Sequence, residues 1–562
     1  MEQSKEITGK KSNRIFVIVM AGLLLLQLLA LFYYGGRKEG YHEDELYTYY
    51  SSNKTAGLFV NDRQWMTRDE LRNDFVVLPG EQFRYNVVKQ MQSWDVHPPL
   101  YYYIFHTACS FFPNLFSKWL GISINIIAYV LSYLLLAYCA YTAATQNKVT
   151  DAAAQDQASK GKRLAFLTCL TWGLSSAVIS GVLFIRMYQW LTVFILLCAA
   201  LHLRAMKKQD FRIRSFLLPL AITVFLGFMT QYYYLIFHFF MGAGFCFYLF
   251  RKKRIKELFS YAAACAVGLG AAICYYPASL SHIFRGYRGT EAVTEFSNAG
   301  NTWERLQFFY GLFDDYVMNG TLSWWLLILC LLAVTAGYLK KRKADSDGVS
   351  GKTSLLSESI GLLLFTCAGY FFTISKTALL LGETSNRYQL PIYGLLLFLL
   401  LYATWILLGG FLARKPQTEQ KDASKVQTSL FAGMLVLLLA IDGMALAHGK
   451  VFFLYEEEKP IMEYVKSNTD VPVVVFYNEA SSEKIWWLSN ELMEFPEVYL
   501  ASQGNSEEIS DERINDSNHV LVYVADYENQ TKCLDALLKT NHNLQEYQVA
   551  YEKNGWTLYE LR

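Results

Sequence analysis

The chain has 562 residues, of which 53% are hydrophobic and 16% aromatic, and its formal net charge at pH 7 is +2. This composition is too apolar for a single soluble core, and the balanced charge gives no sign of a nucleic-acid partner. Runs of about 20 apolar residues recur, which is the length needed to cross about 30 Å of hydrocarbon. The composition therefore predicts a polytopic α-helical membrane protein.

The first apolar span is predicted over residues 15–34, as a retained anchor because it lacks a small-residue cleavage site. Basic residues precede it, and basic residues mark the cytoplasmic side of short loops. We therefore expect a cytoplasmic N-terminus and an outer segment over about 35–118. Within that segment, 98–112 is apolar but too short to cross, which favours a juxtamembrane helix lying at the interface.

Ten further spans are expected along the rest of the membrane domain. They are predicted at about 119–145, 164–185, 188–203, 215–231, 233–250, 258–276, 323–339, 355–380, 388–412 and 428–447. This arrangement, about 11 transmembrane helices in all, places every basic cluster on one side of the membrane. It assigns residues 1–448 to the membrane domain, with a second outer loop over about 277–322.

Residues 449–562 have a different pattern. Segments 471–477, 497–500 and 519–525 are typical of strands, and helical segments are predicted at 459–467, 482–490 and 530–540. Strands that alternate with helices predict a small α/β domain, which the span count places outside the cytoplasm. The domain has no glycine-rich phosphate loop and no metal-ligand spacing, so we expect it to serve packing or acceptor docking.

Three consecutive acids, Glu43, Asp44 and Glu45, follow the first span directly. Acids beside hydrocarbon are costly unless they are solvated, paired or used. A carboxylate at the outer surface can take the proton from an acceptor hydroxyl during a transfer reaction. The spacing alone is equally consistent with acids that only solvate the end of the span.

A second conspicuous stretch begins at His97 and continues Pro-Pro-Leu-Tyr-Tyr. Paired prolines cannot continue a preceding helix and they favour the start of the next one. His97 is therefore either a polar residue at the interface or a functional one, as an acid–base partner, a substrate hydrogen-bond donor or a metal ligand. His42 and His97 are candidates for a divalent cation, although their spacing is not diagnostic.

Cations at the outer ends of spans are candidates for binding a phosphate. Arg186 and Tyr188 lie at the junction of the third and fourth spans, and Arg387 and Tyr388 open the tenth, with Lys376 just before it. Arginine suits multidentate phosphate contact. The alternative is that these side chains only reach the headgroups. Because positive charge is sparse on the outer face, we favour a functional role for Arg387.

The outer loop 277–322 carries Arg285 and Arg288 beside two glycines. Glycine allows the backbone to approach a substrate closely. The loop is thus either part of a donor-binding surface or an ordinary flexible basic loop.

The acidic pair Asp44-Glu45 after the first span, followed by His97-Pro-Pro-Leu-Tyr-Tyr, resembles the GT-C superfamily of polyprenyl-phosphate-dependent membrane glycosyltransferases. These proteins include the protein O-mannosyltransferases and the lipid A aminoarabinose transferases. The resemblance covers about residues 15–400 and implies that Asp44 is the catalytic aspartate, with Glu45 as its neighbour. It also implies that an Arg-Tyr pair followed by Pro lies near the donor phosphate. The chain departs from the aminoarabinose branch at Val96 and His97, where that branch has an acid.

The resemblance implies an inverting transfer of a sugar from a polyprenyl-phosphate donor to a hydroxyl of an acceptor lipid, glycan or protein. Asp44 would be the general base and Arg387 and Arg186 would hold the phosphate, with no cofactor required. Short inner loops favour a bacterial plasma membrane. One alternative is a transporter or flippase of lipid-linked sugars, which predicts mid-bilayer ionisable residues and internal repeats. The other is a non-catalytic envelope assembly factor, in which Asp44 would be replaceable.

Overall fold

The computed structural model describes residues 2–54, 62–145, 151–347, 357–412, 420–505, 509–525, 530–553 and 555–562. The chain divides into two compact units, which are described separately. The helical unit comprises Met1–Gly36, Asp95–Tyr101 and Ile122–Phe452. The sheet unit comprises Arg37–Trp94, Tyr102–Gly121 and Phe453–Arg562. Most of the outer segment 35–118 is therefore grouped with the C-terminal region.

Within the described residues, nine helices are long and apolar enough to cross a membrane, or up to eleven if each of two bent pairs is one span. They are Asn13–Arg37, Lys118–Ala144, Tyr188–Lys208, Ile213–Thr230, Tyr233–Arg251, Ile255–Tyr275, Glu358–Thr377, Gly382–Gly409 and Thr428–Ala447, with the bent pairs Asp156–Leu174 + Ser176–Leu183 and Ala299–Val317 + Leu322–Tyr338. Each of the eleven predicted spans coincides with one of these candidates. The polytopic helical fold that the composition predicted is confirmed.

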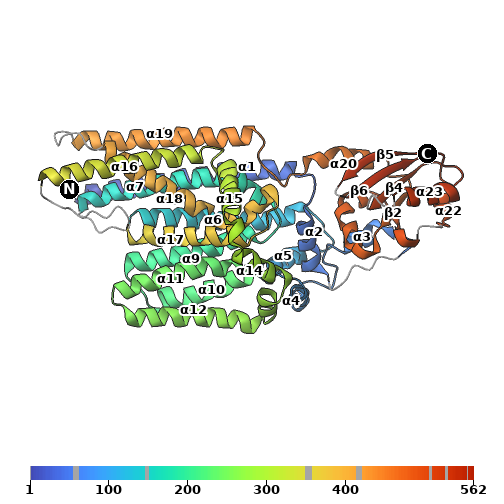
Figure 1. Cartoon of the computed structure of the whole chain (residues 1–562), viewed down its shortest axis with the longest axis horizontal. Helices are drawn as coiled ribbons and strands as arrows, with labels where there is room; N and C mark the ends of the chain where they lie inside the picture. The colour runs from blue at the N-terminus through green and yellow to red at the C-terminus, as the bar shows by residue number, and fades with distance from the viewer. Residues whose placement is uncertain are drawn as a thin grey trace. The chain divides into compact units, whose positions relative to one another are not determined.

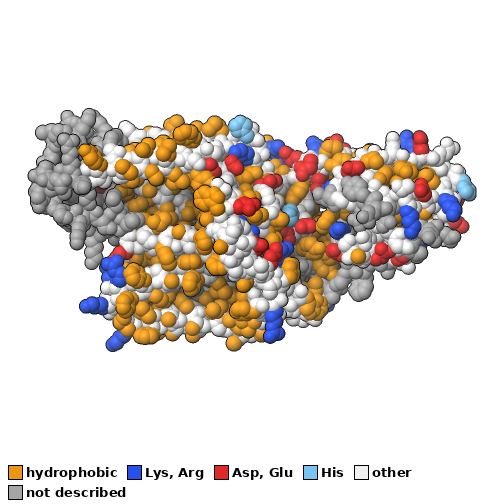
Figure 2. Space-filling view, in the orientation of Figure 1, with side chains coloured by type: hydrophobic (Ala, Val, Ile, Leu, Met, Phe, Trp, Pro, Cys, Tyr) orange, Lys and Arg blue, Asp and Glu red, His pale blue; other side chains and the backbone are white. Residues whose placement is uncertain are grey.

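Long helices of the helical unit run side by side in Figure 1. The elements of its predicted spans are α1 (Glu2–Arg37), α6 (Lys118–Ala144), α7 (Asp151–Leu174), α8 (Ser176–Leu183), α9 (Tyr188–Lys208), η1 (Ile213–Leu217), α10 (Leu218–Thr230), α11 (Tyr233–Arg251), α12 (Ile255–Tyr275), α16 (Leu322–Asp347), α17 (Glu358–Thr377), α18 (Asn386–Leu412) and α19 (Gln420–Ala447). On the face of this unit shown in Figure 2, apolar side chains cover much of the surface. Such a surface is expected where lipid tails replace water.

The two bends have local causes. Helix α7 ends before Ser175, whose extended backbone (ψ 142°) starts α8 at an angle of 58°. Helix α15 (Thr302–Val317) turns by 100° into α16, and Asn319 and Gly320 between them have positive φ, which Asn and Gly tolerate best. The outer loop 277–322 is therefore largely helical. It also contains α13 (Ala278–Phe284), α14 (Tyr287–Ser297) and η2 (Ala299–Asn301).

The sheet unit contains one six-stranded sheet in the order β1-β3-β2-β4-β6-β5. Its strands are β1 (Gln64–Thr67), β2 (Val473–Tyr477), β3 (Glu497–Ser502), β4 (Val520–Ala525), β5 (Tyr547–Lys553) and β6 (Trp556–Leu561). Strand β2 pairs in parallel with β3 and β4, and the other pairs are antiparallel. The three predicted strands are these parallel ones. Strands β1, β5 and β6 were not predicted, and β1 comes from the outer segment near the N-terminus.

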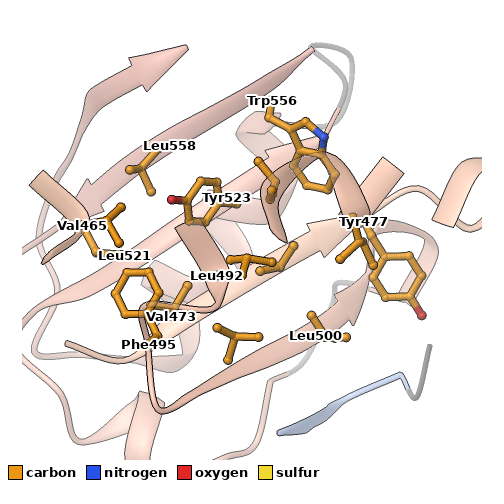
Figure 3. Close-up of a cluster of buried hydrophobic side chains, with 14 of the residues drawn as sticks. Val465, Val473, Tyr477, Leu492, Phe495, Leu500, Leu521, Tyr523, Trp556 and Leu558 are labelled. Atoms are coloured by element: carbon orange, nitrogen blue, oxygen red, sulfur yellow. The ribbon is translucent and has the colours of Figure 1, made fainter. Parts of the chain in front are cut away.

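The parallel strands are apolar on both faces because both faces are covered. On β2, Val473, Val475 and Tyr477 belong to one core cluster, which is drawn in Figure 3, and Val474 and Phe476 belong to the other. The first cluster includes residues of α3 (Arg68–Asn73), α20 (Lys459–Lys466), η5 (Glu479–Leu488) and α21 (Ser489–Leu492). The second includes residues of α22 (Glu512–Asn515) and α23 (Gln530–Thr540). The predicted helix over 482–490 is mostly 3₁₀ in form.

The rest of the sheet unit includes α2 (Glu43–Asn53), α4 (Tyr85–Trp94) and η4 (Glu456–Glu458). Helix α5 (Leu100–Phe111) runs from the helical unit into the sheet unit and corresponds to the short helix predicted over 98–112. It starts directly after Pro99, as the paired prolines indicated.

Helices α10 and α12 approach closely because α12 carries a glycine at the contact. A Cβ added at Gly268 would lie 2.4 Å from the backbone oxygen of Ala221, whereas one at Gly270 would meet nothing within 4 Å. We expect Gly268→Ala to lower the free energy of unfolding by about 1–3 kcal/mol through overpacking. Gly270→Ala should leave it unchanged or raise it by up to about 1 kcal/mol, since alanine favours a helix.

The measurement is the denaturant midpoint of the purified full chain in one detergent. Equal effects of the two substitutions would contradict the close approach of α10 and α12 at Gly268.

Candidate functional site

The predicted acidic motif forms the N-terminus of α2. His42 is the N-cap, where its Nδ1 accepts a hydrogen bond from the Asp44 backbone N–H at 3.0 Å. The Glu45 carboxylate in turn accepts from the His42 N–H at 2.7 Å. This is a capping box with histidine in the place of serine or threonine. Three acids in the first turn also complement the positive end of the helix dipole.

Glu45 is fully buried and is held by a cation that sequence reasoning did not single out. Its Oε2 lies 2.9 Å from Nζ of Lys38, which is fully buried as well. The Lys38 ammonium also donates to the carbonyl of Phe453 at 2.7 Å. Burial lowers the pKa of Lys38, and the charge of Glu45 opposes that shift. The buried Glu45 carboxylate therefore fixes the start of α2 within the sheet unit.

Asp44 is in a different environment from its neighbour. Its side chain is 26% exposed, and its Oδ2 lies 3.8 Å from Nδ1 of His42. Because that nitrogen accepts a hydrogen bond from the Asp44 N–H, it carries no proton, and the 3.8 Å contact is not an ion pair. Of the two predicted catalytic acids, Asp44 is the one that a substrate could reach.

A second group of predicted residues meets in the helical unit, around Arg387 at the start of α18. The buried Arg387 guanidinium lies over the rings of Tyr388 (5.0 Å), Phe184 (5.4 Å) and Tyr188 (5.9 Å). Its Nη2 donates to the hydroxyl of Tyr388 at 3.1 Å. The rings of Tyr188 and Tyr388 meet edge to face. These aromatic contacts fix the plane of the guanidinium and favour the cation electrostatically.

Arg186 lies in the same segment as Phe184 and Tyr188, between α8 and α9, and it is also buried. Its Nη2 is 3.4 Å from Nε2 of His97, and Nδ1 of His97 is 2.9 Å from Oδ2 of Asp95. Since arginine can only donate, His97 accepts through Nε2 and donates through Nδ1 to Asp95. We call Asp95, His97 and Arg186 together with Arg387, Tyr188 and Tyr388 the arginine cluster.

Asp95 was not among the predicted site residues, although it stands two positions before His97. Burial raises the pKa of Asp95, but His97 and Arg186 lower it further, so that the pKa is about 2. The side chain is therefore a carboxylate at any pH above that value, and it fixes the orientation of the His97 ring. The acid at position 95 can be read in the sequence, but its contact with the His97 side chain cannot.

The remaining predicted cations have other neighbours. Lys376 is buried and donates to Asn298, Asn301 and Thr302, so it joins α17 to the segment that leads into α15. Arg285 and Arg288 are exposed, and Arg288 pairs with Glu291 at 3.2 Å. Burial lowers the pKa of Arg288, but Tyr287, Glu291 and, more weakly, Tyr388 raise it above its usual value. Arg288 is thus within electrostatic range of the arginine cluster.

The structure assembles the predicted residues within each unit. His42, Asp44 and Glu45 belong to the sheet unit, and the arginine cluster belongs to the helical unit. In the described part of the chain, no group of three or more His, Cys, Asp or Glu side chains is arranged to hold a metal ion. A divalent cation at His42 or His97 stays a prediction.

The buried Lys38–Glu45 pair can be compared with an exposed neighbour, Arg37–Glu456, whose atoms are 2.6 Å apart. We expect Lys38→Met to destabilise α2 by about 3–5 kcal/mol, because it leaves a buried carboxylate without its cation. Glu456→Gln should cost less than about 1 kcal/mol. The double variant Lys38→Met/Glu45→Gln should recover most of the loss, since neither position then carries a buried charge.

Hydrogen exchange over 38–53 in the full chain measures the opening free energy of α2. A loss for Lys38→Met no larger than that for Glu456→Gln would contradict the anchoring role.

Comparisons with protein-family models and with curated proteins find no match. Among solved structures, ArnT from Cupriavidus metallidurans bound to undecaprenyl phosphate is similar, with a TM-score of 0.51 and 10% sequence identity over 96% of this chain and 97% of that chain. ArnT in the apo state has a TM-score of 0.44 and 11% identity over 92% of this chain and 96% of that chain. The chain therefore shares the overall fold of ArnT, a polytopic helical membrane unit with a small C-terminal sheet region, which is the fold that the sequence predicted.

Proposed function

We propose that this protein is a membrane glycosyltransferase that uses a polyprenyl-phosphate-linked sugar as its donor. The observation that carries the proposal is the arginine cluster within a GT-C fold. Arg387 lies over the rings of Phe184 and Tyr188, Arg186 stands between these two residues in the sequence, and both arginines are buried. Burying a guanidinium group costs several kcal/mol, and an anionic ligand offsets part of that cost.

A donor phosphate matches the geometry of the arginine cluster. Phosphate oxygens accept paired hydrogen bonds from planar guanidinium groups. Three rings hold the plane of Arg387, and Arg186 contacts His97. ArnT, the solved neighbour, is bound to undecaprenyl phosphate. A polyprenyl phosphate is accordingly our proposed leaving group, with Arg186, Arg387, Tyr388, Tyr188 and His97 as its ligands.

In the proposed reaction, the acceptor hydroxyl attacks the anomeric carbon from the face opposite the phosphate, so the configuration inverts. The hydroxyl proton passes to the carboxylate of Asp44. The electron pair of the breaking sugar–oxygen bond stays on the polyprenyl phosphate, where the arginines stabilise the growing negative charge. Glu45 positions the helix that carries Asp44 and does not itself exchange a proton. No step requires a cofactor.

The acceptor is a hydroxyl of an envelope lipid, glycan or protein. We place the reaction at the outer face of a bacterial plasma membrane, with the N-terminus in the cytoplasm and residues 449–562 outside the cell. This orientation follows from the basic loops.

Asp44→Asn removes the proposed base and should reduce sugar transfer by about 10²- to 10⁴-fold. Glu43→Gln is the matched control, because it removes the same charge from an exposed position one residue earlier in the same helix turn, and it should change transfer by less than about threefold. Mass spectrometry of polyprenyl-phosphate sugars and surface glycans compares cells carrying each variant with wild-type cells and cells lacking the protein. We expect Asp44→Asn to match the cells without protein, with the donor accumulating and one glycan missing.

If cells carrying Asp44→Asn instead match wild-type cells while the cells without protein differ, the protein is a transporter or an assembly factor and not an enzyme.

Arg387→Lys keeps the positive charge but loses the planar group that stacks on three rings. We expect the affinity for undecaprenyl phosphate to fall by about ten- to a hundredfold. Arg251→Lys is the control, since Arg251 also lies over a ring, that of Phe247 at 6.0 Å, outside the arginine cluster. Binding to the purified full chain can be measured by thermal shift. Unchanged affinity in Arg387→Lys would remove the arginine cluster from the donor site.

A further inference from the structure

A basic cavity lies at the end of α9 that is remote from the arginine cluster. Helix α9 begins at Tyr188, in the cluster, and its 21 residues extend for about 30 Å to Lys208. There, the last turn of α9, the start of η1 and the first turn of α12 enclose about 890 Å³. The basic-loop pattern predicts that this end of the helical unit is cytoplasmic.

The charged residues of the cavity leave an excess of positive charge. Arg204, Lys208, Arg212 and Arg254 line it together with the acids Asp210 and Glu257, so four cations and two anions give +2. Both acids are already engaged: Asp210 accepts two bonds from Arg212, each 2.9 Å long, and Glu257 lies 3.7 Å from Arg254.

Two cations of the cavity remain available for a ligand. Arg204 and Lys208 are four residues apart on α9 and so lie on the same face of that helix. Both are exposed, and the described residues place no carboxylate within ion-pair distance of either. The third, Arg254, is held by stacking on Phe211 at 4.8 Å. The cavity thus combines one fixed guanidinium with two adjustable cations.

The walls of the cavity continue into an apolar surface. Ile213 and Leu218 on one side are 68% and 52% exposed, and Ile255 and Phe259 on the other are 44% and 68% exposed. Figure 2 shows Lys and Arg side chains at this end of α11 and α12 beside the apolar surface of the helices. In a membrane, such a boundary lies where headgroups meet hydrocarbon.

We propose that this cavity binds the phosphate of an anionic phospholipid headgroup, whose acyl chains lie along the exposed side chains of η1, α10 and α12. Basic pockets between membrane helices are suited to such headgroups. A soluble phosphate shares the charged contacts but gains nothing from the apolar border. The inference stands apart from the proposed glycosyl transfer, because no residue of the cavity belongs to the arginine cluster or to α2.

The test uses the full chain in detergent and counts bound lipid by native mass spectrometry, with dioleoyl-phosphatidylglycerol as the probe and dioleoyl-phosphatidylcholine as the uncharged comparison. The wild-type protein should retain phosphatidylglycerol in preference to phosphatidylcholine. Arg204→Gln/Lys208→Gln should bind it about ten- to thirtyfold more weakly, since each cation near an anionic headgroup contributes about 1 kcal/mol. The matched control is Arg251→Gln/Lys256→Gln, which removes two exposed charges at the same end but outside the cavity. It should bind within about twofold of wild type.

Further measurements distinguish the phosphate of a lipid headgroup from a soluble phosphate. Arg204→Lys/Lys208→Arg keeps both charges and should keep the binding, which excludes a folding defect as the cause of any loss. Inorganic phosphate and glycerol 1-phosphate at equal concentration should not displace the lipid. The lipid site is overturned if either displaces it, if the two double glutamine variants lose binding equally, or if Arg204→Gln/Lys208→Gln binds like wild type.

Discussion

The start of α2 depends on one buried ion pair, Lys38–Glu45. Two charges removed from water are stable only when they satisfy each other and further hydrogen bonds, and here the Phe453 carbonyl and the His42 N–H complete the set. Because Glu45 is fixed in this way, the helix begins at a defined residue. Asp44, one position earlier, is left at the edge with a partly exposed carboxylate. Three acids in sequence thus acquire unequal chemical roles from their burial.

The cost of burying charge also applies to the arginine cluster of the helical unit, where two of the buried groups are cations. Arg387 is enclosed by aromatic rings, and Arg186 contacts a histidine that is oriented by Asp95. The three rings leave few conformations open to Arg387, so this side chain would lose little entropy on binding the anion that we propose. A cationic group at the start of membrane helices is suited to the lipid-linked phosphate donor that we propose.

The membrane helices could be predicted from the sequence because each needs only a local run of apolar residues. The same holds for β2, β3 and β4, whose apolar runs are buried on both faces. Strand β1 has only four residues, and its pairing with β3 joins segments more than 400 positions apart. No local sequence pattern therefore predicted this strand. Strand β5 is mostly exposed, and the sequence pattern did not distinguish it from a loop.

The sequence by itself determined the spans, the side on which their basic loops gather, and the residue types suited to phosphate and proton transfer. The tertiary structure decided which of those residues are buried and what they contact. In the tertiary structure, Glu45 is buried against Lys38 whereas Asp44 is partly exposed. Asp95 contacts His97, and Lys376 donates to Thr302 at the start of α15. Burial and partners depend on segments far apart in the chain, such as Lys38 and Phe453. Spacing along the sequence carries no information about such contacts.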